Sequence, residues 1–172
     1  MMTVLNVISY CAAAVAVIAI PFLLIDCARF NKARKVHPLV TPRFPKKAIS
    51  LFLVSTLTVV IVSTAMSTYA RYDVLKFVNS LSGNYKVYVN QQEVPEPDKM
   101  VSALKELAPY WAHHSHPTKR IRLLIRTDVR DLTLELGRDS DNPQEYWIFY
   151  PEHDLTSNNE IGRITTSAFN EY

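Results

Sequence analysis

Three histidines, His113, His114 and His116, are the residues of this sequence that come nearest to a chemical motif, in the stretch Trp111-Ala-His-His-Ser-His. Neutral imidazoles bind zinc, copper and nickel, so a metal site on these histidines is one hypothesis. A catalytic zinc site needs three protein ligands and an open position, and neither a cysteine nor a carboxylate lies near this stretch in sequence. We therefore favour an exposed polar loop, whose histidines could also titrate together as a pH response.

Other motifs that carry a reaction are not found in the sequence. The stretch Asp139-Ser-Asp141-Asn142 has the spacing of calcium ligands but lacks the central glycine and distal glutamate of an EF-hand loop. No serine occupies a Gly-x-Ser-x-Gly elbow, and the three glycines of the chain do not form a phosphate-binding loop. A pair of carboxylates for hydrolysis, such as Glu145 with Glu152, is left as an alternative, although nothing in the sequence singles it out. We expect no enzyme, no catalytic residue and no cofactor.

Aromatic side chains are numerous in the C-terminal part of the chain. Such side chains are favoured both in the core of a small sheet and at protein interfaces. We expect most of them to be core residues and take Tyr110 and Trp111 as the interface candidates. The set consists of Tyr85, Tyr88, Tyr110, Trp111, Tyr146, Trp147, Phe149 and Tyr150.

Positive charge is concentrated in one short segment, residues 26–47, which holds seven basic residues and one acid. The basic residues are Arg29, Lys32, Arg34, Lys35, Arg43, Lys46 and Lys47. From Tyr69 onward, 12 basic and 15 acidic residues give a formal charge of −3, so the sequence gives no reason to expect nucleic-acid binding. Prolines at positions 38, 42 and 45 favour a stiff, non-helical loop in the basic segment.

Two stretches without a charged residue, 4–25 and 48–70, are long enough to cross the hydrocarbon core as helices. The first lacks a preceding positively charged region, so we interpret it as a retained anchor rather than a cleaved signal peptide. The predicted parts are a transmembrane helix at 1–25, a basic cytoplasmic loop at 26–47, a second transmembrane helix at 48–70 and an extracytoplasmic domain at 71–172.

Lysine and arginine near the ends of membrane spans are retained in the cytoplasm. The basic segment between the two spans therefore predicts a two-pass protein of the inner (plasma) membrane, with the N-terminus and the C-terminal domain outside the cytoplasm. A second use of these charges, attraction of anionic lipid head groups, is an alternative to a role in topology alone.

Periodicity predicts the elements of the C-terminal domain. Apolar residues at helical spacing continue the second helix to a cap at Gly83, and Pro97 introduces a further helix. Alternating residues predict a strand at 85–90, a hairpin at 120–136 in which an arginine pairs with Glu135 across the strands, and a central strand at 145–150. The tail at 151–172 closes the core as a short strand or helix.

The predicted fold class is therefore two transmembrane α-helices plus a small α+β domain, an antiparallel sheet of three to five strands with one packed helix. We expect a membrane-anchored, non-enzymatic binding module whose partners are the lipid bilayer and a protein of the envelope or an incoming toxin, as in an immunity or accessory protein. One alternative is a subunit of an inner-membrane complex assembled through the two helices, which the serines and threonines of 48–70 motivate. A weaker one is a metal or pH sensor that uses the histidines. The sequence does not indicate an oligomeric state.

Overall fold

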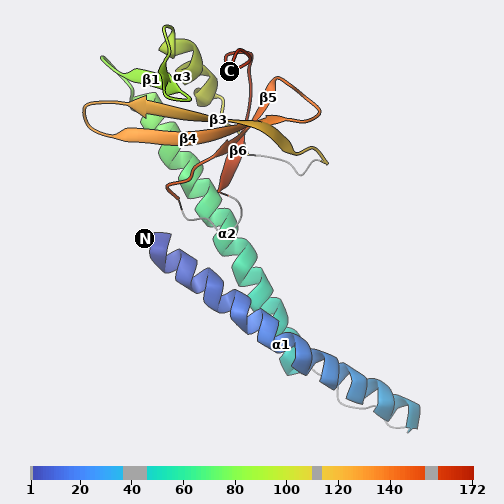
Figure 1. Ribbon diagram of the computed structural model, residues 1–172. Coiled ribbons are helices and arrows are strands. Elements are labelled where there is room, and N and C mark those ends of the chain that lie inside the picture. The colour runs from blue at the N-terminus through green and yellow to red at the C-terminus, as the bar shows by residue number, and fades with distance from the viewer. Residues whose placement is uncertain (1, 37–45, 110–113, 154–158) are drawn as a thin grey trace. The chain divides into compact units, whose positions relative to one another are not determined.

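The computed structural model describes residues 2–36, 46–109, 114–153 and 159–172 (Figure 1). The chain divides into two compact units, Met1–Thr64 and Ala65–Tyr172, with the boundary inside the second helix. In order along the chain, the elements are α1 (Met2–Val36), α2 (Lys46–Ser80), β1 (Lys86–Val89), β2 (Gln92–Glu93), α3 (Pro97–Lys105), β3 (Pro117–Arg126), β4 (Asp131–Asp139), β5 (Glu145–Phe149) and β6 (Glu160–Thr165).

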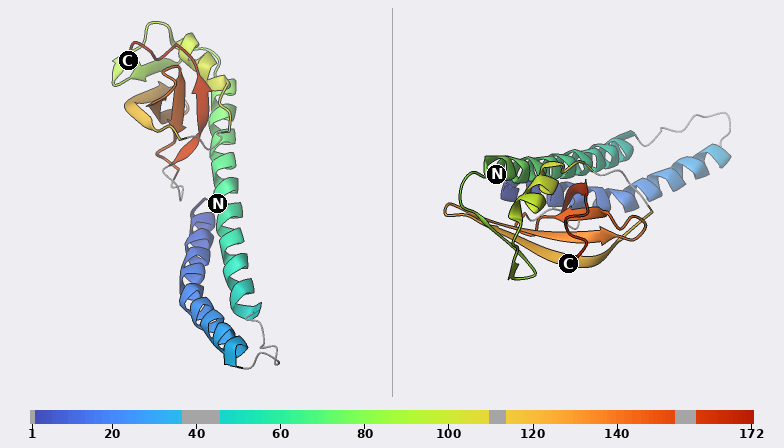
Figure 2. Two further views of the ribbon diagram at one scale, coloured as in Figure 1. Left: turned by 90° about the vertical axis from the view of Figure 1, so that its right-hand side faces the viewer. Right: turned by 90° about the horizontal axis from the view of Figure 1, so that it is seen from above.

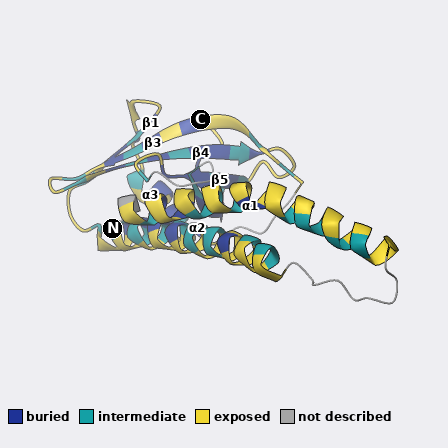
Figure 3. Ribbon diagram, turned by 90° about the horizontal axis from the view of Figure 1, so that it is seen from below, coloured by how far each residue is buried: buried dark blue, intermediate teal, exposed yellow. Residues whose placement is uncertain are grey.

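The first unit consists of α1 and the N-terminal part of α2. Both helices are long and apolar enough to cross a membrane, as judged by their length and composition. The core helix of a soluble protein meets the same criterion, but such a helix is mostly buried. Here only 11% of the most apolar window of either helix is buried, and exposed residues run along α1 (Figure 3). The chain therefore has two candidate membrane spans.

Helix α1 continues well beyond the end of its apolar run. The sequence predicts a non-helical segment from residue 26, whereas α1 ends only at Val36. No proline or glycine interrupts residues 26–36, and arginine and lysine are good helix formers. Arg34 and Lys35 in the last turn also interact favourably with the negative end of the helix dipole. The three prolines lie in 37–45, outside the described residues.

The second unit contains one six-stranded sheet with the order β2-β1-β3-β4-β5-β6. Every pair of neighbouring strands is antiparallel. The predicted α+β class with an antiparallel sheet is therefore confirmed, but the sheet has more strands than the expected three to five. Beyond the four strands that alternation predicts, the sheet contains β2, within residues 90–93, which the sequence indicates as a tight turn, and β6, in the tail, where periodicity could not decide between a strand and a helix.

Two helices, rather than the expected one, cover the same face of this sheet: α3 and the C-terminal part of α2 (Figures 1 and 2). Met66, Ala70, Val74 and Val78 recur every four residues along α2 and are completely buried. The Ser67 hydroxyl donates a hydrogen bond of 3.1 Å to the carbonyl oxygen of Glu160 at the start of β6. The apolar stripe of α2 therefore continues from the candidate span into the core of the second unit.

The hairpin of β3 and β4 supplies the centre of the core. Its inward residues are completely or almost completely buried, and each contributes on the order of 1.5–3 kcal/mol to folding. They are Ile121, Leu123 and Ile125 on β3, and Leu132, Leu134 and Leu136 on β4. The register pairs them directly across the two strands, as the alternating pattern predicts. The other face of the sheet carries the polar members of the same strands.

Strand β6 lies at an edge of the sheet, where the chain that follows α3 covers part of it. Ala108 and Arg163 exchange two backbone hydrogen bonds of 3.0 Å. This close approach requires glycine at position 162, since a Cβ there would lie 2.2 Å from the carbonyl oxygen of Ala108. Gly162 also has a φ of +155°, which other residues rarely adopt.

We predict that Gly162→Ala lowers the free energy of unfolding by about 3 kcal/mol or more, because the new methyl group must break the pairing with Ala108. The matched control is Gly83→Ala. Gly83 also has a positive φ, +85°, but a Cβ there would meet nothing within 4 Å, so the expected loss is about 1 kcal/mol. Urea unfolding of the full chain in detergent, followed by tryptophan fluorescence, measures both. Equal losses would contradict the steric argument.

Candidate functional site

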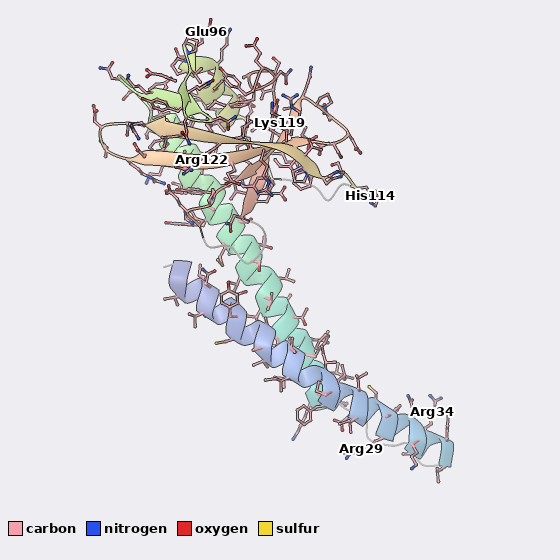
Figure 4. All side chains as sticks on the ribbon, in the orientation of Figure 1. Arg29, Arg34, Glu96, His114, Lys119 and Arg122 are labelled. Atoms are coloured by element: carbon pink, nitrogen blue, oxygen red, sulfur yellow. The ribbon has the colours of Figure 1, made fainter. Side chains whose placement is uncertain are left out.

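The predicted histidine cluster is only partly described. His113, Tyr110 and Trp111 lie outside the described residues. His114 and His116 are exposed in the segment that precedes β3 (Figure 4), and the backbone of His116 exchanges hydrogen bonds with Ser140. Within the described ranges, no group of three or more histidines, cysteines, aspartates or glutamates is arranged to hold a metal ion. Metal binding by the three histidines and an interface at Tyr110 and Trp111 stay predictions.

The basic residues predicted to set the topology lie at the ends of the two candidate spans. Arg29, Lys32, Arg34 and Lys35 lie on the C-terminal turns of α1, and Lys46 and Lys47 begin α2; Arg43 lies outside the described residues. Arg29 and Asp26 form an exposed ion pair at 3.9 Å. Among these residues, the cationic side chains thus cluster at one end of each apolar helix, as the sequence predicts.

Four of the hydroxyl groups of α2 that suggested assembly through the helices are satisfied within that helix. Thr56, Thr58 and Thr64 each donate a hydrogen bond of 2.8–2.9 Å to the carbonyl oxygen four residues earlier. Ser55 does the same at 2.8 Å. These hydroxyls therefore do not require a second helix as a hydrogen-bonding partner, and the predicted membrane-complex alternative gains no support from them.

The acidic turn between β4 and β5 is organised by one carboxylate. Asp139 is buried, and its Oδ1 accepts hydrogen bonds from the backbone N–H groups of Asp141 and Asn142 at 2.9 and 3.0 Å. Its Oδ2 accepts the indole N–H of Trp147 at 2.7 Å. Burial acts to raise the pKa of Asp139, but hydrogen bonds from Ser115, Trp147 and the turn more than offset it and hold the pKa well below its usual range. Asp139 is a structural residue.

A second polar network joins α2 to the sheet. Arg130, in the turn between β3 and β4, binds both carboxylate oxygens of Asp73 on α2, at 3.3 and 2.7 Å. Its Nη2 also donates to the hydroxyl of Tyr150 at 2.6 Å, and its guanidinium lies 5.3 Å from the ring centre of Phe77. The hydrogen bonds to Asp73 raise the pKa of Arg130, and burial raises that of Tyr150. This network fixes the β3–β4 turn against α2.

The face of the sheet opposite α2 and α3 is not covered by any helix in the described part of the chain. We call it the open face. Arginines and aromatic residues, the types enriched at protein interfaces, lie on it beside carboxylates. It consists of Tyr88 on β1, Arg120, Arg122, Leu124 and Arg126 on β3, Asp131, Thr133, Glu135 and Gly137 on β4, Glu145, Trp147 and Phe149 on β5, and Arg163 on β6, as the strand register shows, with Phe149 and Arg163 buried.

Arginines stack on the aromatic rings of the open face in three places. The guanidinium of Arg163 lies 3.7 Å from the ring centre of Trp147, that of Arg120 lies 4.5 Å from Phe149, and that of Arg126 lies 5.6 Å from Tyr88. Such cation–π contacts orient the guanidinium as well as attract it. The open face is therefore a patterned surface whose positive charges are held in place.

Carboxylates of the open face and its edge pair with these arginines. Arg120 with Glu135, as the sequence predicts, and Arg126 with Asp131 have nitrogen–oxygen distances of 3.1 and 3.2 Å. Arg163 is buried and pairs with Glu145 at 2.9 Å and with Glu160 at 3.5 Å. Burial raises the pKa of Glu160. These acids position arginines of the open face.

A groove of about 280 Å³ opens over β1 and β3 on the open face. Tyr88, Gln91, Arg122, Leu124 and Arg126 line it. A wider depression of about 830 Å³ lies between α3 and the C-terminal residues, but its lysine, Lys99, already pairs with Glu96. The groove over β1 and β3 is thus the site where cationic side chains, an amide and apolar surface converge.

The sequence contained a signal for this groove that the analysis of motifs missed. Arginines at positions 120, 122 and 126 alternate with apolar residues on a predicted strand, so one face of that strand is cationic. The partner strand carries Asp131, Glu135 and Asp139, but the register places Asp139 opposite Pro117 and Gly137 opposite Arg120. The sequence therefore shows a cationic strand face, and only the register shows that it has one arginine more than opposing acids.

Comparisons of the chain with protein-family models, with curated proteins and with solved structures gave no match. Function is therefore inferred from the geometry of the open face and from the two candidate spans.

We predict that Asp139→Asn reduces the loss of stability on acidification. Because the folded protein lowers the pKa of Asp139 below its usual 3.8, the ionised carboxylate stabilises the fold above that value, and this contribution is lost as the pH falls toward the lowered pKa. Between about pH 7 and about pH 3, thermal unfolding should show about 1 kcal/mol less loss in the variant than in the parent.

The control for this comparison is Asp141→Asn in the same turn, since Asp141 is exposed and accepts a side-chain hydrogen bond from Ser140 only. Its pH dependence should follow that of the parent chain. If the two variants lost the same amount of stability on acidification, the buried carboxylate of Asp139 would not be the group responsible.

Proposed function

We propose that this chain is a membrane-anchored, non-enzymatic binding module. Its two apolar helices hold it in the inner membrane, and its C-terminal domain lies outside the cytoplasm and binds a protein of the envelope or an incoming toxin through the open face. The role would be that of an immunity or accessory protein. The observation that carries the proposal is the open face itself, a sheet surface of arginine and aromatic side chains without a covering helix among the described residues.

The composition of the open face supports a protein partner. Tryptophan, tyrosine and arginine dominate the energetics of protein interfaces, and the two aromatic side chains bury a large area with few rotatable bonds. On the open face these residues are held in place by stacking and by ion pairs, so little side-chain entropy is lost when a partner binds.

Both edges of the sheet are protected, which favours a face rather than an edge as the contact surface. At one edge, β2 is only two residues long. At the other, the chain at Ala108 pairs with β6. Short or covered edges do not recruit a strand from another protein, so a partner meets side chains rather than backbone.

The charge pattern at the candidate spans supports the proposed orientation. Cationic residues lie at the C-terminal end of α1 and at the start of α2, where the positive-inside rule assigns the cytoplasm. The other end of α2 carries fewer cations, Arg71 and Lys76. A domain that follows α2 would then lie outside.

We predict that a cysteine at Val129 is accessible from outside the cytoplasm and that one at Lys32 is not. Val129 is 95% exposed in the β3–β4 turn, and Lys32 is exposed on the C-terminal part of α1. In a chain whose Cys11 and Cys27 are replaced by serine, an impermeant maleimide applied to spheroplasts should label only the cysteine at 129. Cell lysis should expose the cysteine at 32, and the reverse pattern would show that the orientation is wrong.

We predict that a photo-crosslinking amino acid at Thr133, on the open face, captures one discrete protein partner in living cells. The same amino acid at Lys105, exposed at the end of α3 on the covered side of the sheet, is the control and should capture none. Immunoblots for the chain measure the adducts. The proposal fails if Thr133 gives no adduct, or if both positions give the same ones.

A further inference from the structure

Not every arginine of β3 forms an ion pair with a carboxylate of the described residues. Arg126 lies opposite Asp131 and pairs with it. Arg122 lies directly opposite Glu135 in the register, yet the carboxylate of Glu135 binds Arg120 at 3.1 Å. Among the described residues, the guanidinium of Arg122 therefore has no carboxylate partner, although an acid stands across from it on the next strand.

Glu135 binds Arg120 rather than Arg122 because of the residue that lies opposite Arg120. The residue paired with Arg120 is Gly137, which offers no side chain. A Cβ at that position would lie 2.6 Å from the Cβ of Pro117 and 3.2 Å from the ring of Phe149. The space over Gly137 is instead occupied by Pro117 and by the ring of Phe149, on which Arg120 stacks. That stacking places the guanidinium of Arg120 where it takes the carboxylate of Glu135.

The free guanidinium lies in the groove over β1 and β3, whose walls combine charge with apolar surface. Tyr88 and Leu124 face one another across the two strands and form its apolar part. Arg122 and Arg126 supply two guanidinium groups, of which Arg126 uses its Nε for Asp131. A guanidinium binds a carboxylate through two parallel hydrogen bonds, so this arrangement suits an acidic side chain that has an apolar neighbour.

Gln91 adds an amide to the rim of this groove in a backbone conformation that glutamine rarely adopts. Residues 90 and 91 form the two-residue turn between β1 and β2, and both have positive φ angles, 49° and 71°. Turns of this kind favour asparagine at the first position and glycine at the second. Glutamine in place of glycine costs stability and places a hydrogen-bonding side chain at the groove.

We propose that this groove binds a glutamate or aspartate side chain, flanked by an apolar residue, in a segment of the protein partner. This inference rests on the proposed function and specifies the chemistry of its contact. The occupant is an acidic protein segment because one arginine lacks an acid and because the groove, at about 280 Å³, holds one side chain and part of its neighbour. The formal charge of −3 from Tyr69 onward disfavours a phosphate polymer.

The test uses the full chain in lipid nanodiscs and two short peptides, N-acetyl-Leu-Glu-Leu-amide and its glutamine counterpart. Binding is followed by the NMR signals of the arginine Nε–H groups. We expect the glutamate peptide to bind about tenfold more tightly, as a charged pair of hydrogen bonds implies. Arg122→Gln should abolish this preference. Lys119→Gln, which removes a charge from the same strand but not from the groove, should retain it.

A second variant tests the turn. Gln91→Gly keeps both arginines and relieves the unfavourable backbone conformation, so we expect a higher unfolding temperature together with several-fold weaker binding of the glutamate peptide. Unchanged binding would exclude Gln91 from the site.

Three results would overturn the inference: equal binding of the two peptides, a preference that survives Arg122→Gln, or displacement of the glutamate peptide by inorganic phosphate at equal concentration. The last would show a general anion site. If the peptides fail but the adduct from Thr133 persists in cells, the acidic contact is wrong and the binding function stands. If the adduct is absent as well, both fall together.

Discussion

The hairpin of β3 and β4 divides the second unit into two faces, and the rest of that unit depends on this division. Its residues alternate between leucine or isoleucine and charged side chains, and a shift of one residue in register would bury the arginines and expose the core. The buried side attracts α2 and α3, whose apolar stripes complete the core. The other side is left with a row of arginines that must be supported by rings and carboxylates.

That support is distributed unevenly. Arg163 and Arg120 are enclosed by a ring and an acid, and Arg130 is held by Asp73 and Tyr150 on the covered side. Within the described part of the chain, Arg122 lacks an acid because Gly137 and Phe149 direct Arg120 toward Glu135. Such a surface differs from a generally basic patch, since it suits a single acidic group in a defined position rather than a field of phosphates.

Much of the architecture could be predicted from the sequence. Hydropathy located both apolar helices, and the alternation of β3 and β4 gave the hairpin, its faces and the pairing of an arginine with Glu135. Strand β2 was not recognised because it is only two residues long and follows β1 across a tight turn. The choice between strand and helix for β6, and the packing of the end of α2 on the sheet, depend on partners far along the chain: β6 on Ala108, and α2 on β6. Helix α1 also extends beyond its apolar run, since hydropathy marks where charge begins and not where a helix ends.

By itself the sequence determined the properties that are local: two uncharged stretches of membrane length, a cluster of cations between them, and strands with one apolar and one charged face. Periodicity and charge act over a few residues, so they can be read directly. The tertiary structure alone decided which arginine lacks an acid, where the groove opens, and that Asp139 serves a turn. These features depend on the pairing of residues that are distant in sequence. That pairing is set by the cross-strand register, and packing of the whole sheet fixes the register.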